Sequence, residues 1–117
     1  MKKLITVDFD DTLCYNDNIK KENTKLINFI NTLSKKNYQF YIVTARNKEY
    51  DTIFAENKID NFIKKHKLPI EKVIYTDGEL KGETLKNIKS KLHIDNDISQ
   101  IRSCKENNIK TIYVRNL

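Results

Sequence analysis

The chain has 117 residues, of which 38% are hydrophobic and 32% are charged, and its formal net charge is +6. This length predicts one domain over residues 1–117 with a lean core, and the presence of only two glycines and one proline argues against a fibrous or disordered chain. No apolar stretch approaches the length of a membrane span, and residues 1–8 do not read as a signal peptide, so we expect a cytoplasmic protein without a membrane partner.

The net charge indicates which partners the protein favours, and the cysteines and histidines indicate which metal or disulfide sites to expect. A positive net charge favours anionic partners such as nucleotides, sugar phosphates or nucleic acid, without choosing among them. Cys14 and Cys104 lie far apart and form no CxxC pair, so we expect two free thiols in a reducing compartment. Two isolated cysteines and two scattered histidines also provide too few ligands for a zinc site.

The first half of the chain predicts two strands, each followed by a helical segment. Residues 4–7 form a short apolar run that is typical of a buried strand, and aspartates follow it at positions 8, 10 and 11. After a polar turn at 14–20, helical spacing of apolar residues predicts a helix over 21–35. Residues 38–43 predict a second strand. From about residue 47 a helical stretch follows that breaks near 56–57, and Tyr50, Ile53 and Phe54 are expected on its apolar side.

The second half repeats this alternation with shorter elements. Residues 72–76 predict a third strand, 82–91 a helix, 92–94 a very short fourth strand, 98–107 a helix and 110–114 the last strand. Strands that alternate with helices indicate an α/β protein. We therefore expect a three-layer, Rossmann-like fold, in which a five-stranded parallel sheet carries helices on both faces.

Polar side chains of a few types follow the predicted strands. Asp8 and Asp10 come after the first strand, Thr44 ends the second, and Asp95 ends the fourth. Lys81 opens the helix before the fourth strand. Because the carboxyl ends of parallel strands share one edge of the sheet, and a reversal in strand order opens a crevice there, we expect these side chains to converge on one site.

The converging residue types suit chemistry on a phosphate monoester, which is a dianion. Two aspartates that lie two apart point the same way and can hold a divalent cation, for which Mg²⁺ prefers hard oxygen ligands. The Lys81 ammonium would neutralise further charge, and the Thr44 hydroxyl would donate a hydrogen bond to a phosphoryl oxygen. Thr12 is expected to hydrogen-bond the backbone of the turn.

These motifs resemble those of the haloacid dehalogenase-like (HAD) superfamily. Residues 8–12, Asp-Phe-Asp-Asp-Thr, resemble its first motif, and residues 41–44 look like its second, an apolar strand that ends in Thr or Ser. Lys81 falls where the third-motif lysine would stand, and residues 94–97 resemble the acidic fourth motif. The resemblance runs over residues 4–114, nearly the whole chain.

The resemblance implies a Mg²⁺-dependent phosphatase and assigns its roles. Asp8 would be the nucleophile that forms an aspartyl phosphate, and Asp10 the general acid and base. Thr44 and Lys81 would hold the phosphoryl oxygens. Asp8, the backbone carbonyl of Asp10, and Asp95 would bind Mg²⁺.

Three assignments have a second candidate or a departure from the family pattern. Asn96 separates Asp95 from Asp97, whereas the family usually has adjacent acids, and an Asn in the usual acid position would weaken metal binding. Asp97 is the second candidate for the acidic ligand, although it can also cap the next helix. Lys86 is the second candidate for the phosphate-binding lysine, and Arg46 is a candidate to reach a substrate phosphate.

The motifs and their spacing are compatible with several alternative functions. Neither gap between the motifs has room for a cap domain, so the resemblance implies a minimal, capless core, with residues 14–20 as a small flap or a second subunit of a homo-oligomer as a lid. The leading prediction is hydrolysis of a nucleotide, sugar phosphate or other small phosphomonoester, and the alternative is a polynucleotide 3′-phosphatase acting on nucleic-acid ends. Two other classes remain: a catalytically idle HAD-like binding module, and a two-component receiver domain that would accept phosphate on Asp77.

Overall fold

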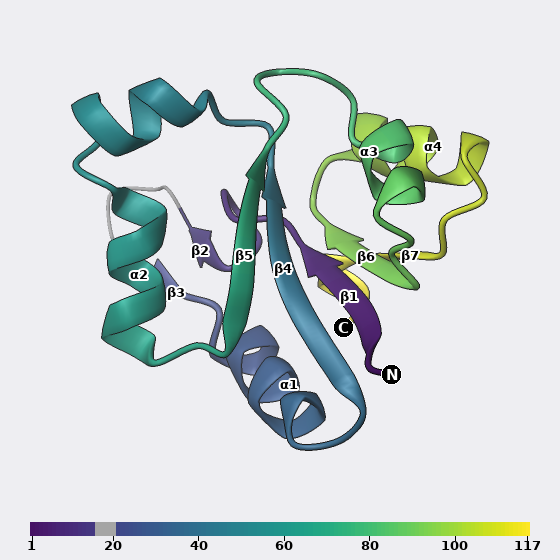
Figure 1. The fold of residues 1–117 in the computed structure, drawn as a ribbon, viewed down its shortest axis with the longest axis horizontal. Coiled ribbons are helices and arrows are strands. Elements are labelled where there is room, and N and C mark those ends of the chain that lie inside the picture. Colours follow the sequence, from purple (N-terminus) through teal and green to yellow (C-terminus); the bar gives the residue numbers. More distant parts are fainter. Residues whose placement is uncertain (16–20) are drawn as a thin grey trace.

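A computed structural model describes residues 1–15 and 21–117. Most of the segment expected to act as a flap, residues 16–20, lies outside the described residues. Five parallel strands form the main sheet in the order β5-β4-β1-β6-β7 (Figure 1). These strands are β1 (Lys3–Val7), β4 (Tyr38–Thr44), β5 (Ile70–Tyr75), β6 (Leu92–Asp95) and β7 (Thr111–Tyr113). The expected α/β fold with a parallel sheet is confirmed.

The strand order reverses at the centre of the sheet. The chain starts in β1, adds β4 and β5 on one side, and then crosses to add β6 and β7 on the other. If the five strands are numbered along the chain, their order is 3-2-1-4-5, which places the crevice at the carboxyl ends of β1 and its neighbours. Receiver domains have the flavodoxin-like order 2-1-3-4-5 instead, so the receiver alternative is wrong.

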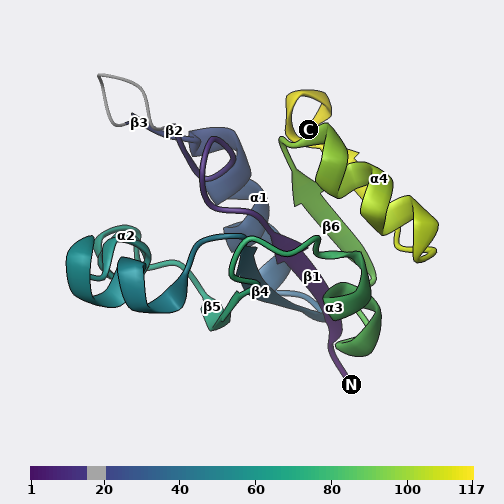
Figure 2. The ribbon, with the colours of Figure 1, turned by 90° about the horizontal axis from the view of Figure 1, so that it is seen from above.

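Helices cover both faces of this sheet (Figures 1 and 2). The helices are α1 (Thr24–Ser34), α2 (Lys58–His66), α3 (Gly82–Asn87) and α4 (Ile98–Glu106). Successive side chains of a strand point to opposite faces. Ile42 of β4 accordingly packs in the larger core with Ile30 of α1, whereas its neighbour Val43 packs in a smaller core with Leu85 of α3 and Cys104 of α4.

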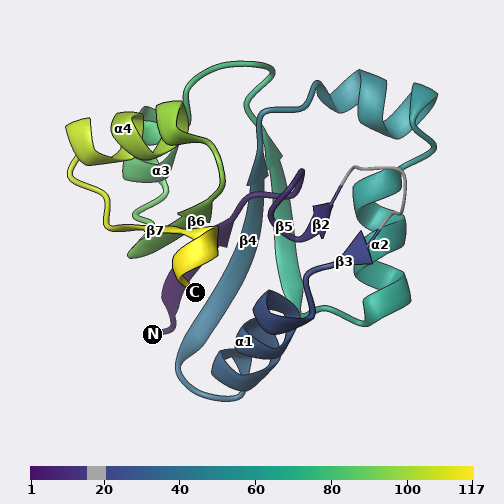
Figure 3. The same cartoon turned by 180° about the vertical axis from the view of Figure 1, so that it is seen from behind.

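The segment between β1 and α1 differs from the expected turn and helix start. The helix begins at Thr24 rather than at residue 21, because the Asn23 side chain caps it by accepting the Leu26 N–H at 3.1 Å. The residues just before it form β3 (Lys21–Glu22), which pairs antiparallel with β2 (Cys14–Tyr15), as Figure 3 shows from behind. No separate cap domain occurs in the described part of the chain.

The helical stretch after β4 has the expected break, and Ile59 of its second part is buried as expected, but its first part faces the opposite way. A π-helical segment (Tyr50–Phe54) precedes α2, and Asn57 between them takes a left-handed φ of 55°. The expectation that Tyr50, Ile53 and Phe54 face inward is wrong: they are 59%, 62% and 72% exposed. The buried residue of this segment is Asp51, because its carboxylate is held by partners near the site.

The remaining differences are small. The helix predicted over 82–91 ends at Asn87, β5 begins two residues earlier than expected, and a 3₁₀ turn (Val114–Asn116) follows β7. Among the described residues, Cys14 and Cys104 form no disulfide, and both are buried. Among the described residues, no helix is both long enough and apolar enough to cross a membrane.

Candidate active site

The segment after β1 turns sharply and presents its aspartates to the crevice. The Asp8 N–H donates to the Ile94 carbonyl at 2.9 Å, which holds the end of β1 beside β6. The Phe9 side chain is fully buried in the core, and its carbonyl oxygen accepts the N–H groups of residues 12–14. Asp8 and Asp10, on either side of Phe9, both line one cavity above the sheet edge.

We call this hollow the aspartate cavity, and its volume is about 280 Å³. Its walls come from the ends of β1, β4 and β6 and from the starts of α3 and α4, as expected for a reversal in strand order. The lining residues are Asp8, Asp10, Asp11, Thr44, Ala45, Arg46, Lys81, Asp95, Asn96, Asp97 and Gln100.

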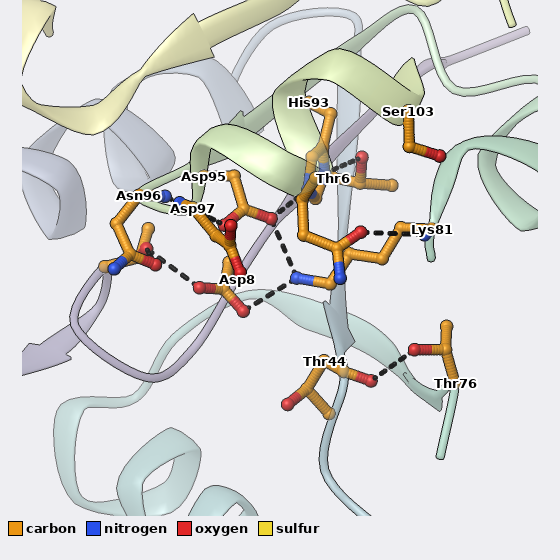
Figure 4. A network of polar contacts seen from close by, with 12 residues as sticks. Thr6, Asp8, Thr44, Thr76, Lys81, His93, Asp95, Asn96, Asp97 and Ser103 are labelled. Carbon is orange, nitrogen blue, oxygen red and sulfur yellow. Dashed lines mark hydrogen bonds and ion pairs between the residues drawn. The ribbon is translucent and has the colours of Figure 1, made fainter. Parts of the chain in front are cut away.

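Lys81 connects the two carboxylates at the floor of the cavity (Figure 4). Its Nζ lies 2.8 Å from Asp8 Oδ1 and 2.8 Å from Asp95 Oδ2, and its side chain is only 1% exposed. Burial opposes the charge, but the two carboxylates raise the pKa of Lys81 above its usual value. The ammonium therefore stays charged between two acids, and removing one partner of such a group typically costs about 3–5 kcal/mol.

A buried relay stands behind Asp95. His93 Nε2 lies 2.8 Å from Asp95 Oδ2, His93 Nδ1 lies 2.8 Å from Thr6 Oγ1, and Thr6 Oγ1 lies 2.8 Å from Ser90 Oγ. Burial lowers the pKa of His93, so the ring is neutral and donates from Nε2 to the carboxylate, which has no proton to give. This relay fixes the orientation of the acid that holds Lys81.

The two carboxyl groups that share Lys81 have opposite titration behaviour. Burial raises the pKa of Asp8 to about 6; the Asp95 charge adds to this rise, and Lys81 and the Thr12 hydroxyl oppose it. Burial acts on Asp95 as well, but the His93 hydrogen bond and the Lys81 charge hold the pKa of Asp95 well below its usual range. Asp95 is therefore a permanent anion, whereas Asp8 titrates near neutrality.

Asn96 lies against the oxygens of Asp8 and Asp10. One of its two amide atoms is 2.9 Å from Asp8 Oδ2, 3.2 Å from the Asp10 carbonyl oxygen and 3.3 Å from Thr12 Oγ1. An NH₂ group at this place has two protons and can donate to the two nearest of these oxygens, Asp8 Oδ2 and the Asp10 carbonyl. A carbonyl oxygen at this place would complete a set of converging oxygens that suits a cation.

This donor set fits Mg²⁺ better than a transition metal. It combines the Asp8 carboxylate, the Asp10 carbonyl and the Asn96 amide, and Mg²⁺ is usually held by one or two carboxylates together with water and substrate phosphate. In the part of the chain that the structure describes, no group of three or more His, Cys, Asp or Glu side chains is arranged to hold a metal. Neutral oxygens therefore have to supply part of any cation site here.

Asp95, the predicted acidic ligand, already accepts four hydrogen bonds. Its Oδ1 takes the N–H groups of Asn96 and Asp97 at 2.8 and 3.1 Å, and its Oδ2 takes Lys81 and His93. A carboxylate offers about four lone-pair sites, so a cation on Asp95 would displace one of these donors. One amide atom of Asn96 lies 2.9 Å from Asp8 Oδ2, so a turn of this amide would present its oxygen to a cation there.

A second charge cluster surrounds Asp10. Arg46 forms a two-pronged contact with it, Nε to Oδ2 and Nη2 to Oδ1, both at 2.7 Å. The third arm, Nη1, lies 2.7 Å from Asp51 Oδ1, and the Tyr75 hydroxyl donates to Asp51 Oδ2 at 2.9 Å. The fully buried Asp51 thus fixes Arg46, and Arg46 fixes the Asp10 carboxylate in a fork geometry that lysine cannot provide.

The other predicted residues separate into those at the cavity and those away from it. Thr44 lines it, and its Oγ1 accepts the Arg46 N–H at 3.2 Å, which leaves the hydroxyl proton free to donate. Asp97 lines it too, but its carboxylate caps α4 by accepting the Ser99 N–H at 2.8 Å. Lys86 is exposed on α3 and does not line the cavity.

Three residues that hold the site in place carried no signal in the sequence. A fourth residue, Thr12, has a different hydrogen-bond partner from the one expected. Asp51, Tyr75 and Gln100 follow no motif; the Gln100 Oε1 accepts the Lys81 N–H at 2.8 Å and so pins the start of α3. The Thr12 hydroxyl, expected on backbone, donates to Asp8 Oδ2 at 3.0 Å. Asp77, the receiver candidate, lies at the end of the edge strand β5, contacts Asn47, and stands outside the aspartate cavity.

The fold has solved counterparts, whereas the sequence comparisons found no match. No protein-family model matches the chain, and no curated protein matches it. A chain of the Pnkp1/Rnl/Hen1 RNA repair complex superposes with a TM-score of 0.76 at 13% identity, over 95% of this chain and 42% of that one. A chain of another Pnkp1/Rnl/Hen1 complex structure gives a TM-score of 0.76 at 12% identity, over 96% and 45%.

These likenesses establish the fold. At 12–13% identity they carry no residue roles across, and this chain spans less than half the length of the chains that it matches. The α/β architecture is thus shared with chains found in RNA repair complexes, and the chemistry has to be argued from the aspartate cavity itself.

Proposed function

We propose that this protein is a HAD-like, Mg²⁺-dependent phosphatase that hydrolyses a phosphomonoester through Asp8. The observation that carries the proposal is the buried Lys81 ammonium between Asp8 and Asp95, beside the converging oxygens of Asp8, Asp10 and Asn96. A carboxylate can approach a phosphate dianion only where positive charge compensates for both. Fixed charge in a partly water-excluded cavity is well suited to stabilise a transferring phosphoryl group.

The residues divide the reaction into two displacements. In the first, an Asp8 oxygen attacks phosphorus, the bond to the leaving oxygen breaks, and Asp10 gives that oxygen its proton. In the second, Asp10 takes a proton from water, the water oxygen attacks the aspartyl phosphate, and inorganic phosphate leaves with Asp8 restored. Lys81 and the Thr44 hydroxyl hold phosphoryl oxygens, and Arg46 orients Asp10.

A cation fits into this scheme at a defined donor set. Asp8, the Asp10 carbonyl and Asn96 would hold Mg²⁺, with Asp95 as the ligand implied by the family resemblance. When bound, the ion supplies charge neutralisation for the phosphate.

The test compares hydrolysis of a phosphomonoester with and without Mg²⁺ in the wild type and in the Asp8→Asn and Asp10→Asn variants. We expect metal-dependent turnover that falls at least about a thousandfold in Asp8→Asn, because the nucleophile is lost. Asp77→Asn, an aspartate outside the cavity, is the matched control and should keep wild-type turnover. Turnover that survives Asp8→Asn would contradict the proposed mechanism.

Two substrate classes compete within this function. A small phosphomonoester such as a nucleotide or sugar phosphate is the broader class, and the shared fold with chains of RNA repair complexes favours a polynucleotide 3′-phosphate. A panel of sugar phosphates, mononucleotides and 3′-phosphorylated oligonucleotides separates them by kcat/KM. If every substrate binds with Mg²⁺ and none turns over, the chain is instead the idle binding module.

A further inference from the structure

A second cavity adjoins the aspartate cavity and takes no part in the proposed chemistry. We call it the side cavity. Its volume is about 390 Å³, within the range of small-ligand sites. It is lined by Asp11, Tyr15, Asn96, Tyr113, Val114 and Arg115. Asp11 and Asn96 also line the aspartate cavity, so the two hollows share one wall and can hold two parts of one molecule.

The position of Tyr113 follows from the register of the sheet. Tyr113 of β7 pairs with Asp95 of β6, so the ring stands at the same carboxyl edge as the phosphate chemistry, one strand further out. The chain then makes its 3₁₀ turn, which brings the Arg115 guanidinium 5.7 Å from the centre of the Tyr113 ring. Tyr15 of β2 contributes a second aromatic side chain and is 37% exposed.

The composition of the walls indicates what the side cavity can bind. Two tyrosines and an arginine provide flat π surfaces and a planar cation, which stack on nucleobases whatever their sequence. Asp11 and Asn96 provide hydrogen-bonding groups for the edge of a base.

We propose that the side cavity binds the nucleobase of a nucleoside phosphate while its phosphate occupies the aspartate cavity. The inference rests on the proposed phosphatase function and specifies its substrate class. Stacking on Tyr113 and Arg115 holds the nucleoside part and so directs the phosphate toward Asp8. A free mononucleotide and the end of a polynucleotide carry the same base and would use the same cavity.

The test measures kcat/KM for matched pairs of substrates that differ only in the base. One pair is a 3′-phosphorylated oligonucleotide with a normal or an abasic terminal residue, and the other is a nucleoside 3′-phosphate with its abasic sugar phosphate. Aryl phosphates are avoided because their own ring can stack. We expect the wild type to prefer the base-bearing member of each pair by about tenfold or more in kcat/KM. The pair with the higher kcat/KM shows whether the base belongs to a polynucleotide end or to a free mononucleotide.

The variants locate this preference. Tyr113→Leu keeps an apolar side chain without the π surface and should bring the preference close to one, while turnover of the abasic substrates stays unchanged. Arg115→Gln should lower it to an intermediate value. Tyr50→Leu and Arg102→Gln change exposed residues outside the side cavity and should retain the wild-type preference.

Two results would overturn the inference: no preference in the wild type, or an equal loss on both members of a pair in Tyr113→Leu. Turnover of the abasic substrates reports the phosphatase separately, so the two proposals can fail independently. If nothing turns over, binding of a 2-aminopurine nucleotide, followed by its fluorescence in the wild type and in Tyr113→Leu, still decides. Binding lost in the variant supports the base site, and no binding to the wild type rejects it.

Discussion

Asn96 is the residue at which this chain departs from the pattern of adjacent acids, and its surroundings give the departure a physical meaning. An amide beside Asp8 Oδ2 and the Asp10 carbonyl can donate its NH₂ group in the metal-free protein or present its oxygen to a cation. A carboxylate at the same place has no donor, so it would repel Asp8 whenever the cation is absent.

This difference predicts the behaviour of Asn96→Asp. We expect Mg²⁺ affinity to rise by roughly tenfold, because the charge count of the ligands sets the affinity of such sites. The metal-free variant should be less stable than the wild type, and Mg²⁺ should raise its melting temperature more. Isothermal calorimetry and thermal unfolding with and without Mg²⁺ measure both effects. An Mg²⁺ affinity that stays unchanged in Asn96→Asp would show that Asn96 does not face the ion.

The raised pKa of Asp8 predicts that the pH profile of kcat/KM has an acid limb, in which activity falls as the pH is lowered. Its pKa of about 6 lies above the usual 3.8, so the protonated form is favoured in the fold and the ionised nucleophile accumulates only as the pH rises through 6. We expect kcat/KM to fall about tenfold per pH unit well below that value, at a fixed low Mg²⁺ concentration.

The Thr12 hydroxyl sets the position of this limb. It donates to Asp8 Oδ2 and favours the ionised form, so Thr12→Val should move the limb to higher pH by roughly half a unit. Thr52→Val, which changes a half-buried threonine away from the cavity, should leave the limb in place. A limb that does not move in Thr12→Val would indicate that another group controls the profile.

At the scale of the elements, the close packing of α3 on α4 positions Lys81. The first residue of α3 is Gly82, and a Cβ there would overlap the Ser103 carbonyl oxygen and lie 2.5 Å from Ser103 Oγ. The Gly82 N–H donates to that hydroxyl at 3.1 Å. Only glycine lets the start of α3 approach α4 this closely, and Lys81 is the residue immediately before it.

Gly82→Ala should therefore affect both stability and activity. We expect a loss of about 1–3 kcal/mol in the free energy of unfolding, from overpacking, measured by urea denaturation. Activity should fall further than the folded fraction, because displacement of α3 carries Lys81 away from Asp8. In Gly78→Ala, the new Cβ meets nothing within 4 Å and only the φ of +85° is unfavourable. That variant should lose about 1–2 kcal/mol with the specific activity of the folded protein intact.

At the scale of the whole molecule, the formal charge of +6 favours anionic substrates, and the salt dependence of KM distinguishes a polyanionic substrate from a small one. Each backbone phosphate that the protein neutralises on a single strand contributes about −0.7 to the slope of log affinity against log salt. We expect KM for a 3′-phosphorylated oligonucleotide to rise steeply with salt, and KM for a mononucleotide to rise much less. Equal salt dependence for the two substrates would place the strand outside the contacts of the protein.

The local sequence pattern was sufficient to predict most of the strands and helices of this molecule. The β-branched run before Asp8, the apolar strand ending at Thr44 and the helix starting after Lys81 each carry their own periodicity, and the parallel sheet follows from their alternation. The expectation that Asp8, Thr44, Lys81 and Asp95 meet at one edge needed only the rule that parallel strands share their carboxyl ends.

Tertiary contacts decided the rest, because they join residues that no local pattern relates. Apolar spacing placed Tyr50 and Phe54 inward, but the buried ion pair of Asp51 with Arg46 outweighs that spacing and turns the segment over. Only the tertiary structure shows that Lys81 lines the cavity, whereas Lys86 is exposed outside it. The sequence by itself therefore determined which groups are available at the strand ends; only the packing of α3 on α4 and the charges around Arg46 determined their geometry and titration, since burial and charge partners come from distant parts of the chain.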